Sequence, residues 1–122
     1  MAWTSGTITL VSGDISRTYL GKELTLLSAV SAIGAGSSNN LNWEAEKWGW
    51  EITPAGFSAL NVTLEGSRDG STWAVIDTST SIVQAVRHIE NKAYIYVRAN
   101  LNSKTGTGTL TVKVVAKMTH QI

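Results

Sequence analysis

The sequence predicts an all-β protein, an antiparallel β-sandwich with a jelly-roll-like arrangement of about eight strands. Three segments alternate between apolar and polar residues, at 60–64, 95–101 and 110–118. That period of two is typical of strands with one buried face. Asp69-Gly70 follows the first of these segments and is a strong hairpin signal, because glycine accepts the positive φ of a tight turn. Several short strands joined by turn signals indicate a sandwich.

Length and composition set the next limits. The chain has 122 residues, and we expect one β-sandwich domain over 1–122 with short N- and C-terminal arms. The formal net charge is +1, so we expect neither nucleic acid nor a membrane as a partner. There is no cysteine, which excludes disulfides and thiolate metal sites. The first residues carry no basic region and no apolar run, so we expect no signal peptide.

The first third of the chain contains two expected strands, at 7–11 and 22–30, with a turn at Ser12-Gly13-Asp14 between them. The second segment is richly apolar, and its composition would also suit a short helix. Gly21 precedes it and a glycine-rich stretch follows, so we interpret it as a strand. We expect 33–40 to be a loop.

A tryptophan-rich segment follows at 41–53. Trp48, Trp50 and Ile52 have the spacing that places them on one face of a strand. Pro54-Ala55-Gly56 is expected to end this strand, because proline cannot donate to the hydrogen-bond ladder.

The central hairpin at 59–78 allows two registers. A loop of two or four residues would place Trp73 and Val75 on the same face as Val62 and Leu64. A three-residue loop with a glycine bulge would place Ala74 and Ile76 there instead. We prefer the first register because it buries the largest side chain, so Asp69 and Gly70 form the turn and Trp73 belongs to the core.

The last third contains expected strands at 81–89, 93–101 and 109–118, with a loop at 102–107. In the second of these, Ile95, Val97, Ala99 and Leu101 face one way. In the third, the inward set is expected to be Leu110, Val112, Val114, Ala116 and Met118.

No arrangement of residues indicates catalysis. The histidines are His88 and His120, and neither follows a nucleophile motif. Glu44 and Glu46, with Glu51 nearby, could act as paired carboxylates of a glycoside hydrolase, but we interpret them as residues that solvate an exposed strand face. We expect no enzyme activity, no cofactor and no metal site, since the pattern around Asp69 is not that of a calcium loop.

Aromatic residues provide the interface candidates. Trp48 and Trp50 are either core residues or a binding face, because aromatic rings dominate protein interfaces and stack on sugars. With the alternate residues of their strand turned inward, Tyr94, Tyr96 and Arg98 are expected to point outward. Trp3 is expected to join them in contacts with neighbouring subunits.

Two runs of residues carry a resemblance. The run Val62-Thr-Leu-Glu-Gly-Ser-Arg-Asp-Gly-Ser-Thr-Trp73, together with Tyr96-Val-Arg-Ala-Asn-Leu101, resembles small β-sandwich virion proteins of tailed bacteriophages. The opening Met-Ala-Trp-Thr-Ser-Gly is similar to small phage proteins as well. The Ser-x-Asp-Gly-x-x-Trp turn is also similar to one in discoidin-like carbohydrate- or lipid-binding domains.

The resemblance implies a virion structural protein, most simply a capsid decoration or cement protein that stabilises the phage head. Its partners would be the major capsid protein or another virion protein, with self-association, and it would be made in the bacterial host cytoplasm. The alternative is a tail- or fibre-associated carbohydrate-binding module for host attachment. A glycan module should lose binding when Trp48 or Trp50 is removed, and a decoration protein should bind empty shells.

Overall fold

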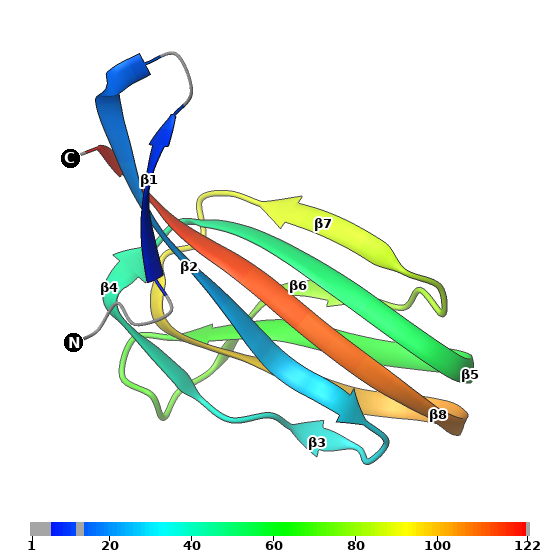
Figure 1. Cartoon of the computed structure of the whole chain (residues 1–122). Helices are drawn as coiled ribbons and strands as arrows, with labels where there is room; N and C mark the ends of the chain where they lie inside the picture. Colours follow the sequence, from blue (N-terminus) through cyan, green and yellow to red (C-terminus); the bar gives the residue numbers. More distant parts are fainter. Residues whose placement is uncertain (1–5, 12–13, 122) are drawn as a thin grey trace.

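The computed structural model describes the backbone of residues 6–11 and 14–121 and the side chains of residues 21–117. The described chain forms β-strands that all pair in antiparallel fashion (Figure 1). The strands are β1 (Gly6–Val11), β2 (Asp14–Val30), β3 (Gly34–Ala35), β4 (Asn39–Ala45), β5 (Lys47–Ser67), β6 (Ala74–Ser79), β7 (Ala85–Ile89) and β8 (Tyr94–Gln121). The prediction of an all-β antiparallel sandwich is therefore confirmed.

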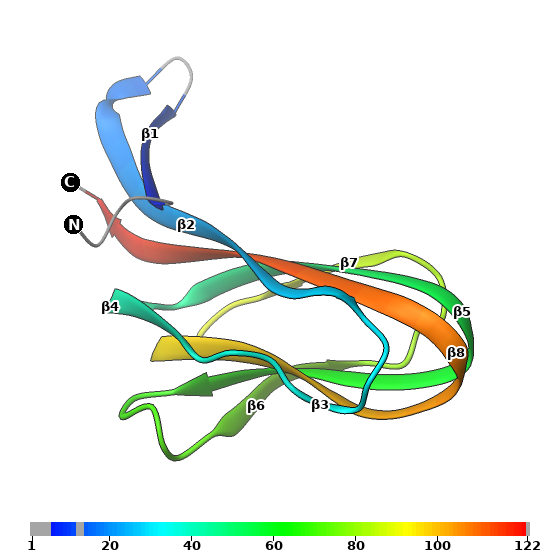
Figure 2. The same cartoon turned by 60° about the horizontal axis from the view of Figure 1, so that its bottom comes forward.

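Two long strands, β5 and β8, pair along most of their length and bend together, so that each contributes to both layers of the sandwich (Figure 2). In the first layer, β2 pairs with the second half of β8, and β7 pairs with the first half of β5. In the second layer, β3 and β4 pair with the first half of β8, and β6 pairs with the second half of β5. We keep the names first layer and second layer below.

Two expectations about this bend were wrong. Pro54-Ala55-Gly56 was expected to end a strand and 102–107 to form a loop, but β5 continues through the first segment and β8 through the second. Pro54 pairs with Leu110, and the register shifts between Ala55 and Phe57 where the chain turns the corner. Bulges of this kind bend a strand without ending it. Gly108 permits the corner, since a Cβ atom there would lie 1.8 Å from the carbonyl oxygen of Ala55.

Two shorter segments also differ from the expectation. The expected loop at 33–40 contains β3 and the first residues of β4. The expected strand at 81–89 forms only from Ala85 onward. Before it, the Ser81 hydroxyl donates to the Val83 carbonyl at 2.7 Å, a local bond that turns the chain and competes with strand pairing.

The core lies between the two layers, and the predicted inward faces fill it. Val97, Ala99 and Leu101 are buried, while Ile95 is half-buried at the end of its row. The other predicted inward residues that are buried are Trp48, Trp50, Ile52, Leu60, Val62, Leu64, Leu110, Val112, Val114 and Ala116. The side chain of Met118 lies outside the described residues.

The central hairpin adopts a register other than the preferred one. Leu64 pairs with Asp77 and Glu65 pairs with Val75, so Ile76 is an extra residue in β6. Ile76 is 6% exposed and belongs to the core, whereas Val75 is 50% exposed. The preferred register was therefore wrong, because the bulge turns Ile76 inward and leaves Val75 on the outer face, opposite Glu65.

The β1–β2 hairpin extends away from the sandwich as a ribbon (Figures 1 and 2). The last pairs between β2 and β8 are Gly21–Lys117 and Tyr19–Gln121, with an irregularity between them, and the ribbon begins there. Beyond that point β2 pairs with β1 alone among the described strands, down to the pair Asp14–Val11. We call residues 6–11 and 14–20 the arm.

Candidate interaction surfaces

The two adjacent tryptophans of β5 are core residues. Trp48 and Trp50 are each 1% exposed. The Trp48 Nε1 atom donates to the Lys92 carbonyl at 2.7 Å, and the Trp50 Nε1 atom donates to Asp77 Oδ2 at 2.9 Å. Both rings are thus packed between the layers with their polar atoms satisfied, which overturns the alternative that they form a glycan-binding or protein-binding face.

Asp77 links β6, an edge strand of the second layer, to β5 and β7 of the first layer. Its carboxylate accepts from Trp50 and also from Arg87 of β7, whose Nη2 lies 3.2 Å from Asp77 Oδ1. Burial acts to raise the pKa of Asp77, but the hydrogen bonds from Arg87 and Trp50 outweigh it, and the pKa is lowered. The hydrogen bond to Asp77, together with the charge of that carboxylate, raises the pKa of Arg87. This contact is structural, because both charges are satisfied within the protein.

The turn between β5 and β6 is built around Asp69. Its Oδ1 atom accepts from the backbone N–H groups of Thr72 and Ser71 at 2.8 Å each and from the Ser67 hydroxyl at 2.9 Å. Those bonds favour the ionised form and lower the pKa of Asp69 to about 2. Gly70 has a φ of 80°, which suits glycine. Both residues therefore lie at the turn of the hairpin.

Trp73 lies outside the buried core, so its assignment as a core residue was wrong. It is half-buried on the outer side of the second layer, because the bulge at Ile76 leaves Val75 opposite Glu65 and Trp73 two residues before it on the same face. The Cζ atom of Arg98 lies 4.1 Å from the centroid of the Trp73 ring, a cation–π contact. Arg98 is held in place by Glu65, whose Oε1 atom accepts from Arg98 Nε at 2.8 Å.

The two tyrosines of β8 have different environments. Tyr96 is half-buried beside the turn, where a Cβ atom at Gly70 would lie 3.4 Å from its ring. Tyr94 packs against the core, and a Cβ atom at Gly66 would lie 2.5 Å from its ring. The expectation that Tyr94 points outward with Arg98 was therefore wrong, because Gly66 leaves the space that the ring occupies.

Polar side chains that were not predicted as site residues surround the Arg98–Glu65 pair. Glu65 Oε2 accepts from Thr63 Oγ1 at 3.0 Å and from Asn100 Nδ2 at 3.3 Å. Asn102 Nδ2 donates to Thr63 Oγ1 at 3.1 Å and to Asn61 Oδ1 at 3.0 Å. Strand alternation already placed Thr63, Glu65, Arg98 and Asn100 opposite the core, whereas Asn102 fell in the expected loop at 102–107. Only the β5–β8 register brings the two rows together.

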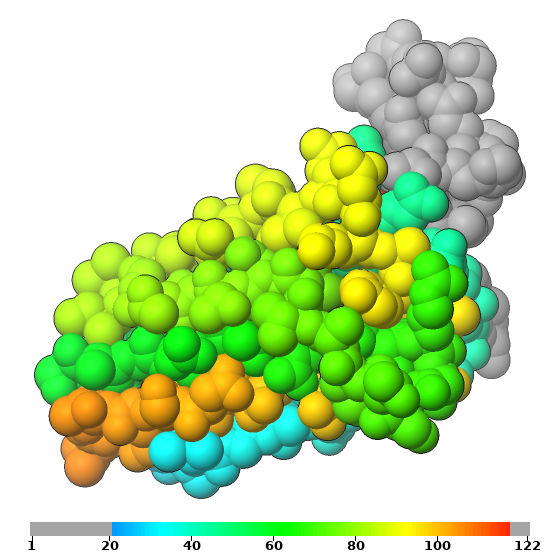
Figure 3. Space-filling model, turned by 180° about the vertical axis from the view of Figure 1, so that it is seen from behind, coloured from blue at the N-terminus to red at the C-terminus, as the bar shows by residue number. Residues whose placement is uncertain are grey.

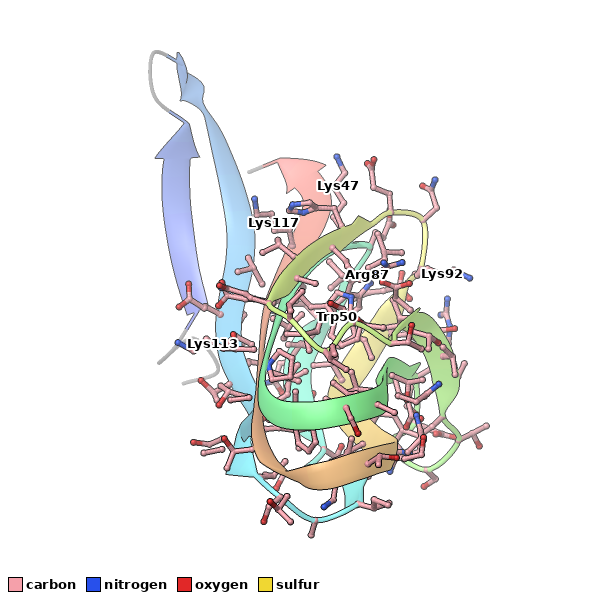
Figure 4. All side chains as sticks on the ribbon, turned by 90° about the vertical axis from the view of Figure 1, so that its right-hand side faces the viewer. Lys47, Trp50, Arg87, Lys92, Lys113 and Lys117 are labelled. Atoms are coloured by element: carbon pink, nitrogen blue, oxygen red, sulfur yellow. The ribbon has the colours of Figure 1, made fainter. Side chains whose placement is uncertain are left out.

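The outer face of the first layer is charged and contains a groove of about 420 Å³. Figure 4 shows Lys113 and Lys117 on this side of the molecule, away from Trp50. Side chains that line the groove include Glu23, Glu51, Val86, His88, Lys113 and Lys117. His88 lies over Gly49, since a Cβ atom there would be 3.2 Å from His88 Nδ1. Charges of both signs are mixed in this groove, so it does not select for one sign of ligand.

Several large apolar side chains of β6, β7 and the segment between them are exposed. Val83 is 66% exposed, and Ile82, Val86 and Val75 are exposed as well. The chain from β6 to β7 is yellow-green in Figure 3, where it lies on the surface next to β5. The Asp77–Arg87 pair lies between these two edge strands.

The described residues form no metal-binding cluster. Among them no cluster of three or more His, Asp or Glu side chains could hold a metal ion. Glu44 pairs with Arg68 at 2.9 Å, and Glu51 accepts from Gln84 at 3.0 Å, so the two carboxylates have separate partners. Trp3 and the side chain of His120 lie outside the described residues. The described chain contains no helix that could cross a membrane.

Comparison with known proteins identifies the fold. No protein-family model and no curated protein matches the sequence. Among solved structures, the SPBc2 prophage-derived protein YomS is similar with a TM-score of 0.62 and 10% identity over 80% of this chain and 92% of that chain. A family 29 carbohydrate-binding module is similar with a TM-score of 0.52 and 10% identity over 93% of this chain and 86% of that chain.

A family 89 glycoside hydrolase from Clostridium perfringens is similar with a TM-score of 0.56 and 15% identity. The match covers 97% of this chain but only 15% of the hydrolase. At these identities the comparisons establish a shared β-sandwich fold.

Proposed function

We propose that this protein is a non-catalytic structural component of a bacteriophage particle, a decoration protein that binds the head. Its partners are the major capsid protein or another virion protein and further copies of itself. The observation that carries the proposal is the arm, a ribbon that leaves the sandwich with one edge of β1 unpaired among the described strands. The similarity in fold to a prophage-derived protein supports it.

The physical reason is the cost of an isolated ribbon. A two-stranded hairpin is only marginally stable in water, because it buries little apolar surface. An unpaired strand edge presents N–H and C=O groups that can pair with another chain. An arm that pairs with a neighbouring subunit satisfies those groups, and the area buried there stabilises the shell.

The mechanism on the particle is adhesion between subunits. The sandwich would rest on one shell subunit while the arm reaches the next, so separating the two shell subunits would also require the arm to be released. Such a contact raises the temperature at which the shell comes apart without any chemical step.

Sedimentation with empty heads of the encoding phage tests the proposal. Wild-type protein should pellet with the heads and raise their melting temperature. Thr9→Pro in β1 removes a backbone donor from the arm and should reduce pelleting, while the sandwich keeps its own melting temperature. Thr80→Ala, an exposed residue after β6, is the matched control.

Two results would contradict the proposal. Wild-type protein that does not bind empty heads would remove the decoration function. Pelleting of Thr9→Pro to the same extent as wild type would show that the arm does not make the contact.

A further inference from the structure

The outer face of the second layer differs chemically from the rest of the surface. In the β5–β8 register Thr63 pairs with Asn100, Glu65 with Arg98, and Ser67 with Tyr96. The side chains that β5 and β8 contribute to this face are therefore hydroxyls, amides and aromatic rings, with Glu65 and Arg98 neutralising each other. Val75 of β6 lies opposite Glu65 and is exposed. The outer face of the first layer carries Glu23, Lys47, Glu51, Lys113 and Lys117.

Trp73 is positioned on this face by a chain of side-chain contacts. Arg98 contacts its ring at 4.1 Å, Glu65 fixes the guanidinium, and Thr63 and Asn100 fix the Glu65 carboxylate. Each member of this chain is oriented by the next, so the ring position is set before any ligand arrives. A ligand that stacks on the remaining exposed part of the indole loses little conformational entropy of the protein.

Polar atoms along β8, on the same face as the ring, are available to a ligand. Among the described residues, Arg98 donates only through Nε, which leaves its two amino nitrogens as donors. Asn102 uses its Nδ2 atom within the sheet, so its Oδ1 atom is the available acceptor. Asn100 uses Nδ2 toward Glu65. The face thus offers donors and acceptors of the kind that match hydroxyl groups.

We propose that this face binds a neutral oligosaccharide. The apolar C–H face of one sugar ring would stack on the side of the Trp73 ring that Arg98 leaves open. Hydroxyl groups of the neighbouring sugar units would bond to Asn100 and Asn102, which follow Arg98 along β8. An uncharged polar ligand with an apolar face fits a surface on which Glu65 and Arg98 neutralise each other. The proposal rests on these residues and is independent of the arm and of head binding.

The residues have two kinds of role. Trp73, Asn100 and Asn102 contact the sugar. Glu65 is a positioning residue, because its carboxylate is 11% exposed and acts through Arg98.

Titration calorimetry with mannohexaose, cellohexaose, xylohexaose and hexa-N-acetylchitohexaose tests the proposal. At least one should bind, and its affinity should not change between low and high salt, because no net charge is neutralised. Trp73→Ala should weaken binding about tenfold or more, as expected for an aromatic contact at the centre of a site. Trp73→Phe, which keeps a ring, should retain part of the affinity.

Lys113→Ala, on the outer face of the first layer, is the matched control and should bind like wild type. Each variant is tested for an unchanged melting temperature, so that loss of binding is not loss of fold. Failure of all four hexasaccharides to bind overturns the proposal, and so does a folded Trp73→Ala variant with wild-type affinity.

Head sedimentation separates this inference from the proposed function. Trp73→Ala should still pellet with empty heads. Loss of sugar binding with normal pelleting would support both proposals, whereas loss of pelleting would assign this face to the shell contact and overturn the sugar site.

Discussion

The indole Nε1 of Trp50 donates to Asp77 Oδ2 at 2.9 Å, which joins a core residue of the first layer to the edge strand of the second. Arg87 of β7 donates to the same carboxylate. One side chain of β6 therefore fixes the distance between the two layers at the side where no continuous strand connects them.

Asp77→Ala is expected to lower the free energy of unfolding by about 1–3 kcal/mol, because the buried Trp50 N–H loses its acceptor. Thr78→Ala, next to it and exposed, should have little effect. Urea titration followed by tryptophan fluorescence measures both. Equal effects of the two substitutions would show that the link between the layers contributes nothing.

Trp50→Ala is expected to cost about 3–5 kcal/mol, the usual cost of removing a large buried aromatic side chain. Trp73→Ala should cost clearly less, since its ring lies outside the core and contacts Arg98 on the surface. The midpoints of denaturant unfolding give the ranking. The reverse order would return Trp73 to the core.

Gly108→Ala is expected to destabilise the protein by about 1–3 kcal/mol, because the new methyl group overlaps the Ala55 carbonyl and the corner must open. Gly21→Ala is the matched control, since its nearest neighbour would be the Ala116 oxygen at 3.6 Å, an ordinary contact. Thermal unfolding by circular dichroism compares the two. Equal melting temperatures would mean that the corner is flexible enough to accept a side chain.

Asp69→Asn is expected to change how stability depends on pH. The folded pKa of Asp69 is about 2, below the ordinary value of 3.8, so the ionised form is favoured in the folded state. Its contribution is complete above the ordinary pKa and is lost as the pH falls through the folded pKa. The gap in melting temperature between wild type and variant should therefore close between these two pKa values, whereas a constant gap would show that the turn does not titrate.

Alternation in the sequence was sufficient to predict the fold class and most of the core. Val62, Leu64, Val97 and Leu101 are buried as expected, because a strand with one buried face must repeat every two residues. The Asp69-Gly70 turn was also predictable, because the bonds that define it join residues close in sequence.

Tertiary structure decided what sequence alternation could not. The extra residue in β6 reversed the faces of Val75 and Ile76, and a one-residue shift leaves the composition unchanged. The bend through Pro54 depends on the close approach of Gly108, which is far away in the sequence.

The candidate sugar site also depends on contacts between segments that are distant in the sequence. The sequence shows that Glu65 and Arg98 each lie on an alternating strand, but not that the two strands pair in the register that brings them together. The sequence determined which side of each strand is apolar, because that depends on local periodicity. The structure alone determined which polar sides meet and which tryptophan remains at the surface, because these depend on contacts between distant segments.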